Sequence, residues 1–510
     1  MSIRTLASFI LPLLAVACLV LLYLSGHELR VRLLNADALY LPTLFDDLLR
    51  GGGRLSDWYL TPAPYFFPDF PMYLVAWWLA PDTYLQIAAF AVIQCALLFG
   101  AAFLLSRALG GGAALPCAAC SLTLLAWLSL PALEPFALLL SSGWHFGAFL
   151  SAVLLVTVWL RFEDTGSRAA LWAACALAFT TTLSDSLFLL QAALPLACAC
   201  SLRLLKEREH QRKPERPRGA ARRLAASWLP AGAALLGHLA YALLVRHHTR
   251  YEVHLNPRQT GANLRDLYAI ARGLWDALPL AVLGWLAFLA FALACALRLA
   301  RGREPFGLTP RLAWLLVFWL VSLACMLAVE LLVDNLPVAA RYFVAAACWP
   351  VLLAPSIAAQ LLRERAPALL LAAGLACTLG TGAAAAAHLR THPLESAYYP
   401  ADSACVDRAL ASAGLRHGIA QYWDAKPFQR FSRRGIVLAP HVEALDELHW
   451  ITSGRYFRPA YDFALVGPWA PPPHHMPAAR LEAINGLPQA EVRCGAYTLL
   501  LYGHDKLKLR

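Results

Sequence analysis

The chain has 510 residues, of which 59% are hydrophobic and only 15% are charged, and its mean hydropathy is +0.54. Soluble domains carry roughly 25% charged residues, so this composition excludes an ordinary soluble protein. The net charge of +11 does not indicate nucleic-acid binding, because much of the excess falls in one loop, 206–223, between two apolar segments. Such a loop is typical of the cytoplasmic side of a membrane, where it meets membrane lipids with anionic headgroups.

The first apolar segment, near residues 5–25, is long enough to cross the bilayer, and no convincing signal-peptide cleavage site follows it. A polar, aromatic loop at 27–70 leads into a short segment, 71–80, whose Trp77 and Trp78 suit the membrane interface. Further candidate spans lie near 84–106, 113–135, 146–160, 169–184, 186–205, 224–245, 275–299, 312–333, 342–362 and 366–388. These segments predict a polytopic α-helical membrane domain over residues 1–389 with about 11 transmembrane helices.

Basic residues place alternate loops, and the N-terminus with them, in the cytoplasm. The loops of that side are at Arg107, 161–168, 206–223, 298–311 and 363–365, whereas the opposite loops, including 27–69 and 247–272, are richer in aromatic and acidic residues. An odd number of spans carries the C-terminal part to the outside. The Ala- and Leu-rich, Lys-poor spans fit a bacterial protein, so we expect a multi-pass protein of the bacterial inner membrane.

Residues 390–510 differ in composition from the rest of the chain, because charged residues and prolines return and no apolar run reaches membrane length. Strand-like runs at 418–423, 435–439, 462–466 and 497–502 alternate with helix-like runs such as 405–413 and 441–451. This alternation predicts a small extracytoplasmic α/β domain. It contains two of the 13 cysteines, Cys405 and Cys494, which either form a disulfide in an oxidising compartment or remain two free thiols.

The first outer loop holds the densest set of candidate site residues. Asp37 follows the first span closely, so its carboxylate lies near the membrane surface. A carboxylate in this place can bind a divalent cation or take a proton from a hydroxyl group. The alternative for Asp37 is an ordinary solvated loop carboxylate or a helix cap.

Several short motifs resemble the GT-C superfamily of glycosyltransferases, in particular the bacterial branch with protein O-mannosyltransferases and lipid A aminoarabinose transferases. Asp37-Ala-Leu-Tyr40 matches the acidic position of the first outer loop, and Phe70-Pro71-Met72-Tyr73-Leu74 matches a proline motif before the next hydrophobic segment. Ser106-Arg107-Ala-Leu-Gly110 and Arg341-Tyr342, followed by two prolines, match later positions. Many members place Lys or His before the proline motif, where this chain has Asp69, so the family's phosphate contact is not carried to that position.

The resemblance implies inverting transfer of a sugar from a polyprenyl-phosphate-linked donor to a lipid, glycan or protein acceptor at the outer face. Asp37 would be the catalytic carboxylate, either as a base or as the ligand of a divalent cation, which is the one cofactor considered. Arg341 would stabilise the leaving phosphate, or it snorkels to the interface. We expect Asp37 and Arg341 to border one outward-opening cavity, with Tyr40, Asp69 and Tyr342 as further substrate contacts.

Two more outer positions complete the predicted site. Asp185, at the turn between two spans, either caps the following helix or places a second carboxylate opposite Asp37. His145 starts the span near 146–160 and is either an interfacial anchor or a ligand or proton-transfer group. Both are predicted as substrate-binding residues.

Two other classes of function stay open at this point. A transporter or flippase of a lipid-linked glycan predicts charges along several spans, and Glu330 is the main example. A non-catalytic membrane assembly protein would use the C-terminal domain to bind a partner, without need of an acid at position 37. The gathering of charges at the outer rim favours the glycosyltransferase.

Overall fold

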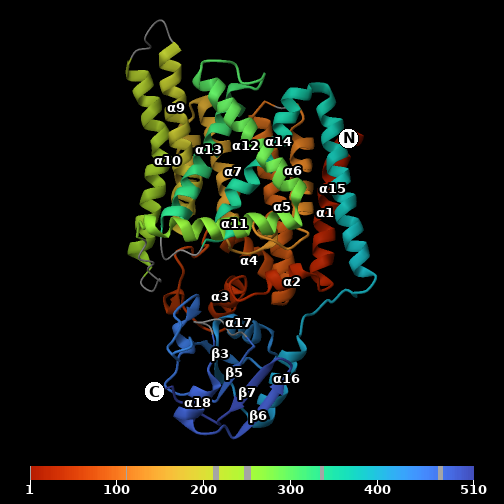
Figure 1. Cartoon of the computed structure of the whole chain (residues 1–510), viewed down its shortest axis with the longest axis vertical. Helices are drawn as coiled ribbons and strands as arrows, with labels where there is room; N and C mark the ends of the chain where they lie inside the picture. The colour runs from red at the N-terminus through yellow and green to blue at the C-terminus, as the bar shows by residue number, and fades with distance from the viewer. Residues whose placement is uncertain are drawn as a thin grey trace.

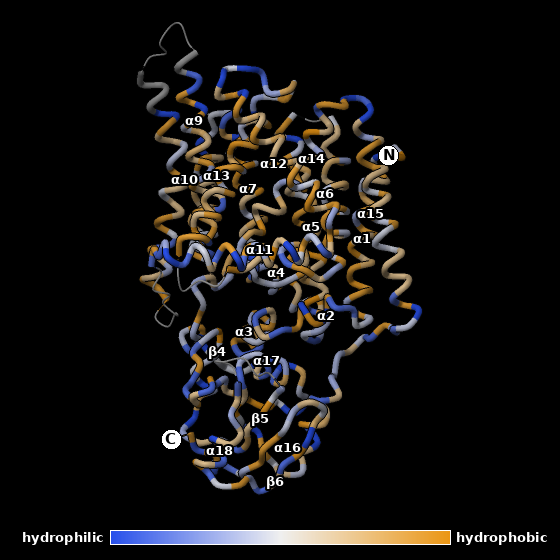
Figure 2. Tube along the Cα trace, in the orientation of Figure 1, coloured by the Kyte–Doolittle hydropathy of each residue, from blue (hydrophilic) through white to orange (hydrophobic). Residues whose placement is uncertain are grey.

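The computed structural model describes residues 2–110, 112–210, 217–245, 254–333, 338–468 and 475–509, with the backbone alone at 208–210 and 217–221. These residues form a bundle of long helices with a small mixed α/β domain at one end (Figure 1). Hydrophobic residues dominate the bundle, and hydrophilic residues gather in the loops and the C-terminal domain (Figure 2). Parts of two predicted loops, 211–216 and 246–253, lie outside the described residues.

Each segment predicted to span the membrane coincides with a helix. The helices are α1 (Ile3–Leu24), α5 (Thr83–Ala108), α6 (Ala114–Leu128), α7 (Phe146–Thr165), α8 (Arg168–Ser184), α9 (Leu194–His210), α10 (Pro217–Leu244), α12 (Pro279–Ala300), α13 (Pro310–Leu332), α14 (Val344–Leu362) and α15 (Ala366–Leu389).

In the described part of the chain, 8 helical stretches are long and apolar enough to cross a membrane. The difference from the predicted number has a simple origin. Helix α6 has 15 residues and α8 has 17, which is short for a span, and α14 and α15 belong to one continuous stretch, Ala340–Leu389. The chain is a multi-span helical membrane protein.

Local sequence sets where these helices begin and end. The Asp82 side chain caps α5 by accepting a hydrogen bond from the Leu85 N–H (3.0 Å), and the Ser167 hydroxyl caps α8 in the same way. Gly166, at φ 63°, ends α7 in the left-handed conformation that glycine adopts without steric cost. The short turn at Gly166 and Ser167 lets α8 pack against α7, and α8 also packs against α10. Helix α1 packs against α6 and α15, which are distant in the sequence.

The first outer loop is a folded cap on the bundle. It contains α2 (Glu28–Leu33), α3 (Tyr40–Leu49) and β1 (Trp58–Tyr59), and it leads into α4 (Asp69–Leu79). Helix α4 is the short segment predicted for the interface, and Trp78 is exposed on it. Helix α11 (Thr260–Ala277) lies across the same end of the bundle (Figure 1). This end therefore carries most of the structure that surrounds the predicted site residues.

The C-terminal domain is built on a five-stranded sheet in the order β3-β2-β5-β7-β6. Strands β2 and β3 and strands β2 and β5 are parallel, whereas β7 is antiparallel to both β5 and β6. The elements are α16 (Ala401–Ala413), β2 (His417–Ala420), α17 (Tyr422–Phe431), β3 (Val437–Pro440), β4 (Thr452–Ser453), β5 (Phe463–Val466), α18 (Ala478–Asn485), β6 (Ala490–Cys494) and β7 (Tyr497–Leu501).

Two local predictions for this domain are wrong. The strand expected at 418–423 ends at Ala420, because the Gln421 side chain accepts the Trp423 N–H (2.8 Å) and starts α17. The helix expected at 441–451 is absent from these described residues. Leu445 adopts a left-handed conformation (φ 64°), and an antiparallel bridge joins His441 to Glu447. Tertiary pairing overrides the helical pattern here.

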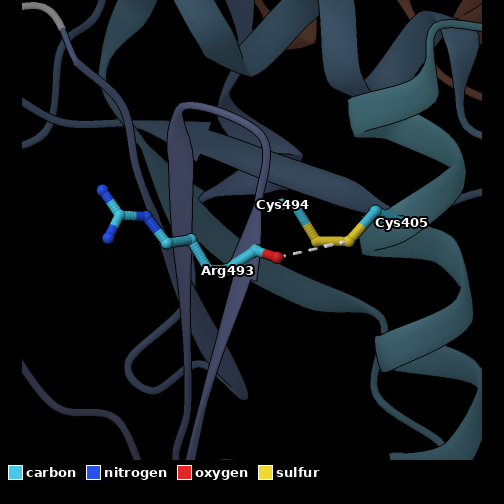
Figure 3. Close-up of a disulfide and its surroundings, with 3 residues drawn as sticks. All are labelled: Cys405, Arg493 and Cys494. Carbon is cyan, nitrogen blue, oxygen red and sulfur yellow. Dashed lines mark hydrogen bonds between the residues drawn. A yellow bond between two sulfur atoms is a disulfide. The ribbon is translucent and has the colours of Figure 1, made fainter.

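A disulfide joins Cys405 of α16 to Cys494 at the end of β6, across 89 residues, with their Cα atoms 5.5 Å apart (Figure 3). Figure 3 also marks a 3.7 Å contact from Cys405 Sγ to the Arg493 carbonyl oxygen. A disulfide sulfur carries no hydrogen, so this contact is not a hydrogen bond. The disulfide is consistent with an extracytoplasmic location of the domain.

The C-terminal domain docks on the first outer loop. Strand β1 pairs antiparallel with β4, with Trp58 opposite Ser453. Arg430 of α17 reaches Asp46 of α3 at 2.7 Å and the Thr83 hydroxyl of α5 at 2.7 Å. These contacts place one face of α17 over the end of the bundle that carries α3 and the start of α5.

Candidate functional site

Asp37 lies in the turn between α2 and α3, where the bundle meets the C-terminal domain. The Asn35 side-chain oxygen accepts the N–H groups of Asp37 and Ala38, both at 3.0 Å, and so fixes the turn. Asp37 is half-buried, and the Tyr422 hydroxyl of α17 donates a hydrogen bond to its carboxylate. Asp37 is therefore neither a freely solvated side chain nor the cap of α3, whose N-cap position is Leu39.

Arg341 belongs to the short 3₁₀ helix Ala340–Phe343, which leads into α14. Its guanidinium lies over the buried rings of Trp144 (5.1 Å) and Tyr342 (5.2 Å), so it packs against protein. It is close enough to Asp37 for their charges to interact. Among the described residues no carboxylate comes within salt-bridge distance of Arg341.

Tyr65 is a buried tyrosine that interacts with Asp37, Arg341 and Asp185. Burial raises the pKa of Tyr65 well above its usual value, Asp185 and Asp37 raise it further, and Arg341 lowers it. The charges of Asp185, Asp37 and Arg341 therefore all act on the Tyr65 hydroxyl group. Asp37 and Arg341 belong to the same cluster, whereas the outward-opening cavity between them stays a prediction.

His145 and Asp185 form a buried pair, with His145 Nδ1 2.6 Å from Asp185 Oδ2. The other oxygen of Asp185 accepts the Leu187 N–H (3.1 Å), so the same side chain also caps the following turn. Asp185 faces His145 and not Asp37. The His145 ring lies 5.3 Å from the ring of Tyr342 and 5.8 Å from that of Tyr65, which places it inside the cluster rather than at a lipid-facing interface.

Asp69, the first residue of α4, is only 1% exposed. Burial raises its pKa to about 7, the Gly143 N–H (2.9 Å) opposes this shift, and Asp185 adds to it. A Cβ atom on Gly147 would come within 2.1 Å of Asp69 Oδ2, so the close approach of α4 to α7 requires a glycine there. Asp69 is thus enclosed beside the His145–Asp185 pair.

The chain before α7 takes an unusual path that serves these contacts. Gly143, Trp144 and His145 all have positive φ angles, of 82°, 65° and 69°. A positive φ angle is energetically costly for Trp144 and His145, because both residues have a Cβ atom. It directs the Gly143 N–H to Asp69, the indole to Arg341 and the imidazole to Asp185.

Tyr40 lies in the packed interior of the first outer loop. Its side chain is buried, and its hydroxyl donates to the Pro64 carbonyl (3.2 Å). Its ring packs beside Trp58 and Tyr65. Tyr40 holds the outer loop in shape, and its hydroxyl is already used.

Sequence reasoning missed the contribution of α17. Lys426 is 6% exposed, and its ammonium group lies 4.2 Å from the centre of the Tyr422 ring. The signal that could have found it is the spacing of four residues between Tyr422 and Lys426, which puts both on one helix face. Burial lowers the pKa of Lys426 to about 7, and Asp37 acts in the opposite direction.

No group of three or more His, Cys, Asp or Glu side chains is placed to hold a metal ion in the part of the chain that the structure describes. The divalent cation considered for Asp37 stays a prediction. What the geometry does provide is a half-buried carboxylate with two cations nearby, Arg341 and Lys426, and neither cation has a direct acidic partner among the described residues.

Comparison with known proteins finds no matching protein family, no similar curated protein and no similar solved structure. The class that fold and composition define is a multi-span helical membrane protein with a disulfide-bonded C-terminal domain.

Proposed function

We propose that the protein is an integral membrane glycosyltransferase of the GT-C type, which transfers a sugar from a polyprenyl-phosphate donor to an extracytoplasmic lipid, glycan or protein. The observation that supports this most directly is the cluster of Asp37 with Arg341 at the outer end of the bundle. Carboxylate and guanidinium are the two groups that such a transfer needs: one for the acceptor's proton, one for the leaving phosphate.

In the proposed reaction Asp37 accepts the proton of the acceptor hydroxyl as its oxygen attacks the anomeric carbon of the sugar. The bond from that carbon to the phosphate oxygen breaks, and its electron pair stays on the phosphate. Arg341 stabilises the negative charge that develops there. Attack opposite to the leaving group inverts the configuration of the anomeric carbon.

The proposed topology places this cluster at the outer face of the bacterial inner membrane. All the helices of the bundle cross the membrane, α6 and α8 included, so the N-terminus is cytoplasmic and the C-terminal domain is periplasmic or extracellular. The excess of arginine in the loops opposite the C-terminal domain supports this orientation, and so does the disulfide.

A transporter is less well supported than a transferase. Glu330, the main charge predicted within a span, lies near the outer end of α13, where it interacts with Arg341. It thus belongs to the outer cluster and does not extend a row of charges through the bilayer. A chain of intramembrane charges is what passage of a charged substrate would favour.

The test is sugar transfer by the purified full-length protein in lipid nanodiscs. Radiolabelled polyprenyl-phosphate sugars are offered with an extract of membrane lipids and glycans, and nucleotide sugars serve as the comparison donors. We expect label to move only from the polyprenyl donors, and Arg341→Gln to lower the rate by about 10²-fold or more. Arg258→Gln, at an exposed outer arginine, is the control. No transfer from any polyprenyl donor would contradict the proposal.

A further inference from the structure

Lys426 is the most unusual cation of the outer end. It is 6% exposed, and its Nζ atom has no hydrogen-bond acceptor in the part of the chain that the structure describes. A buried ammonium without hydrogen-bond partners is unfavourable, so burial lowers the pKa of Lys426 to about 7, and an anion close to it would stabilise the charged form. The contact with the Tyr422 ring at 4.2 Å compensates only in part.

Asp37 does not form a direct ion pair with Lys426. It interacts with Lys426 and with Arg341 through space, while its hydrogen bond comes from the Tyr422 hydroxyl. Lys426 and Arg341 therefore both interact with the charge of Asp37, and neither has a direct acidic partner among the described residues. An anion that enters between the cations would pair with both of them.

We propose that Lys426 is a ligand for the phosphate group of the lipid-linked donor, so that the C-terminal domain completes the donor site. This inference rests on the proposed function and extends it to a residue outside the membrane domain. A phosphate diester carries one negative charge, and the monoester left after sugar transfer carries close to two at neutral pH. A second cation beside Arg341 would help to stabilise the negative charge that develops on the leaving phosphate.

Two contacts hold Lys426 in place for this role. The ring of Tyr422 supports the ammonium group, and the hydroxyl of the same side chain is fixed by Asp37. At the other end of α17, Arg430 is anchored on Asp46 and Thr83. Helix α17 is thus attached to the bundle on both sides of Lys426.

The proposal is tested by binding, without any transfer reaction. Full-length protein is placed in nanodiscs of zwitterionic phosphatidylcholine and titrated with tritiated polyprenyl phosphate. The wild type is compared with Lys426→Met, which keeps the length of the side chain, and with Lys506→Met, a change at an exposed lysine of the same domain. Polyprenol, inorganic phosphate and phosphatidylglycerol are the competitors.

We expect Lys426→Met to weaken the binding of polyprenyl phosphate at least tenfold and Lys506→Met to leave it unchanged, with polyprenol a poor competitor. Equal affinity of the wild type and Lys426→Met would overturn the proposal. Competition by inorganic phosphate or phosphatidylglycerol as strong as by polyprenyl phosphate would also overturn it, because the site would then take any anion.

The melting temperature separates ligand binding from a structural role. Lys426→Met removes an unpaired buried charge, so we expect it to melt no lower than the wild type; a lower melting temperature with unchanged binding would assign the lysine to structure and overturn the proposal. Phosphate binding that depends on Lys426, in a protein that transfers no sugar, would support this site and contradict only the transferase.

Discussion

Buried acids dominate the outer cluster at the scale of single residues. Asp185 shares its carboxylate between His145 and the Leu187 N–H, whereas Asp69 accepts a hydrogen bond from Gly143 in a fully enclosed place. A carboxylate with few donors in an enclosed place holds its proton more tightly. Burial accordingly raises the pKa of Asp69 to about 7.

Gly147→Ala is expected to destabilise the protein by about 1–3 kcal/mol, because the added Cβ meets the Asp69 carboxylate at 2.1 Å. Gly284→Ala in α12 is the matched change, since a Cβ atom there meets nothing within 4 Å. Thermal melting of both variants in detergent measures the difference. A Gly147→Ala protein that melts at the temperature of Gly284→Ala would contradict the enclosed position of Asp69.

Asp69→Asn tests the pKa of about 7. Between the ordinary carboxyl pKa and about 7 the folded protein binds more protons at Asp69 than the unfolded chain does, so stability falls as the pH rises through this range. We expect wild type to lose about 1 kcal/mol more than Asp69→Asn between pH 6 and pH 8. Denaturation at both pH values measures this, and an identical pH dependence of the two proteins would refute the shift.

At the scale of elements, α17 joins the two parts of the molecule. Its face toward the bundle carries Tyr422 and Lys426 at one end and Arg430 at the other, while strands β1 and β4 pair beside it. The helix is held by side chains from α3 and α5 rather than by the sheet of its own domain alone. Loss of one anchor should therefore loosen the domain without unfolding it.

Arg430→Gln is expected to weaken this docking by about 1–3 kcal/mol, because it removes a half-buried ion pair to Asp46 and a hydrogen bond to Thr83. Hydrogen exchange of the α17 amides should become faster, while exchange in β5 and β7 stays the same. Arg434→Gln, at an exposed arginine, should change neither. Unchanged α17 exchange in Arg430→Gln would argue against the anchor.

At the scale of the whole molecule, apolar length and loop composition were enough to predict the helical bundle and the separate C-terminal domain. They also placed Asp37, Asp69, His145, Asp185 and Arg341 at one end of the bundle, and the structure brings these residues together; the assignment of that end to the outer face stays a prediction. The number of membrane spans was harder to predict, because α6 and α8 are short for the thickness of the bilayer.

The residues of the site that the sequence did not reveal, Tyr422 and Lys426, depend on contacts between distant segments. Tyr422 meets Asp37 across 385 residues of sequence, and no local pattern encodes that approach. Lys426 in isolation looks like a lysine on the solvated face of a helix, whereas in the folded protein it is 6% exposed. Tyr40 packs within the protein, as an aromatic residue beside a candidate acid often does, and its contact with a substrate stays a prediction.

The measurement that tests the central claim most directly is the rate of sugar transfer by Asp37→Asn. Asp266→Asn, at an exposed acid of α11, is the matched control, and an intact Cys405–Cys494 disulfide verifies folding. We predict that Asp37→Asn lowers the rate by about 10²–10⁴-fold, with no weaker binding of the donor, and that Asp266→Asn keeps the wild-type rate. Transfer by Asp37→Asn at the wild-type rate would contradict the role of Asp37 as the catalytic carboxylate.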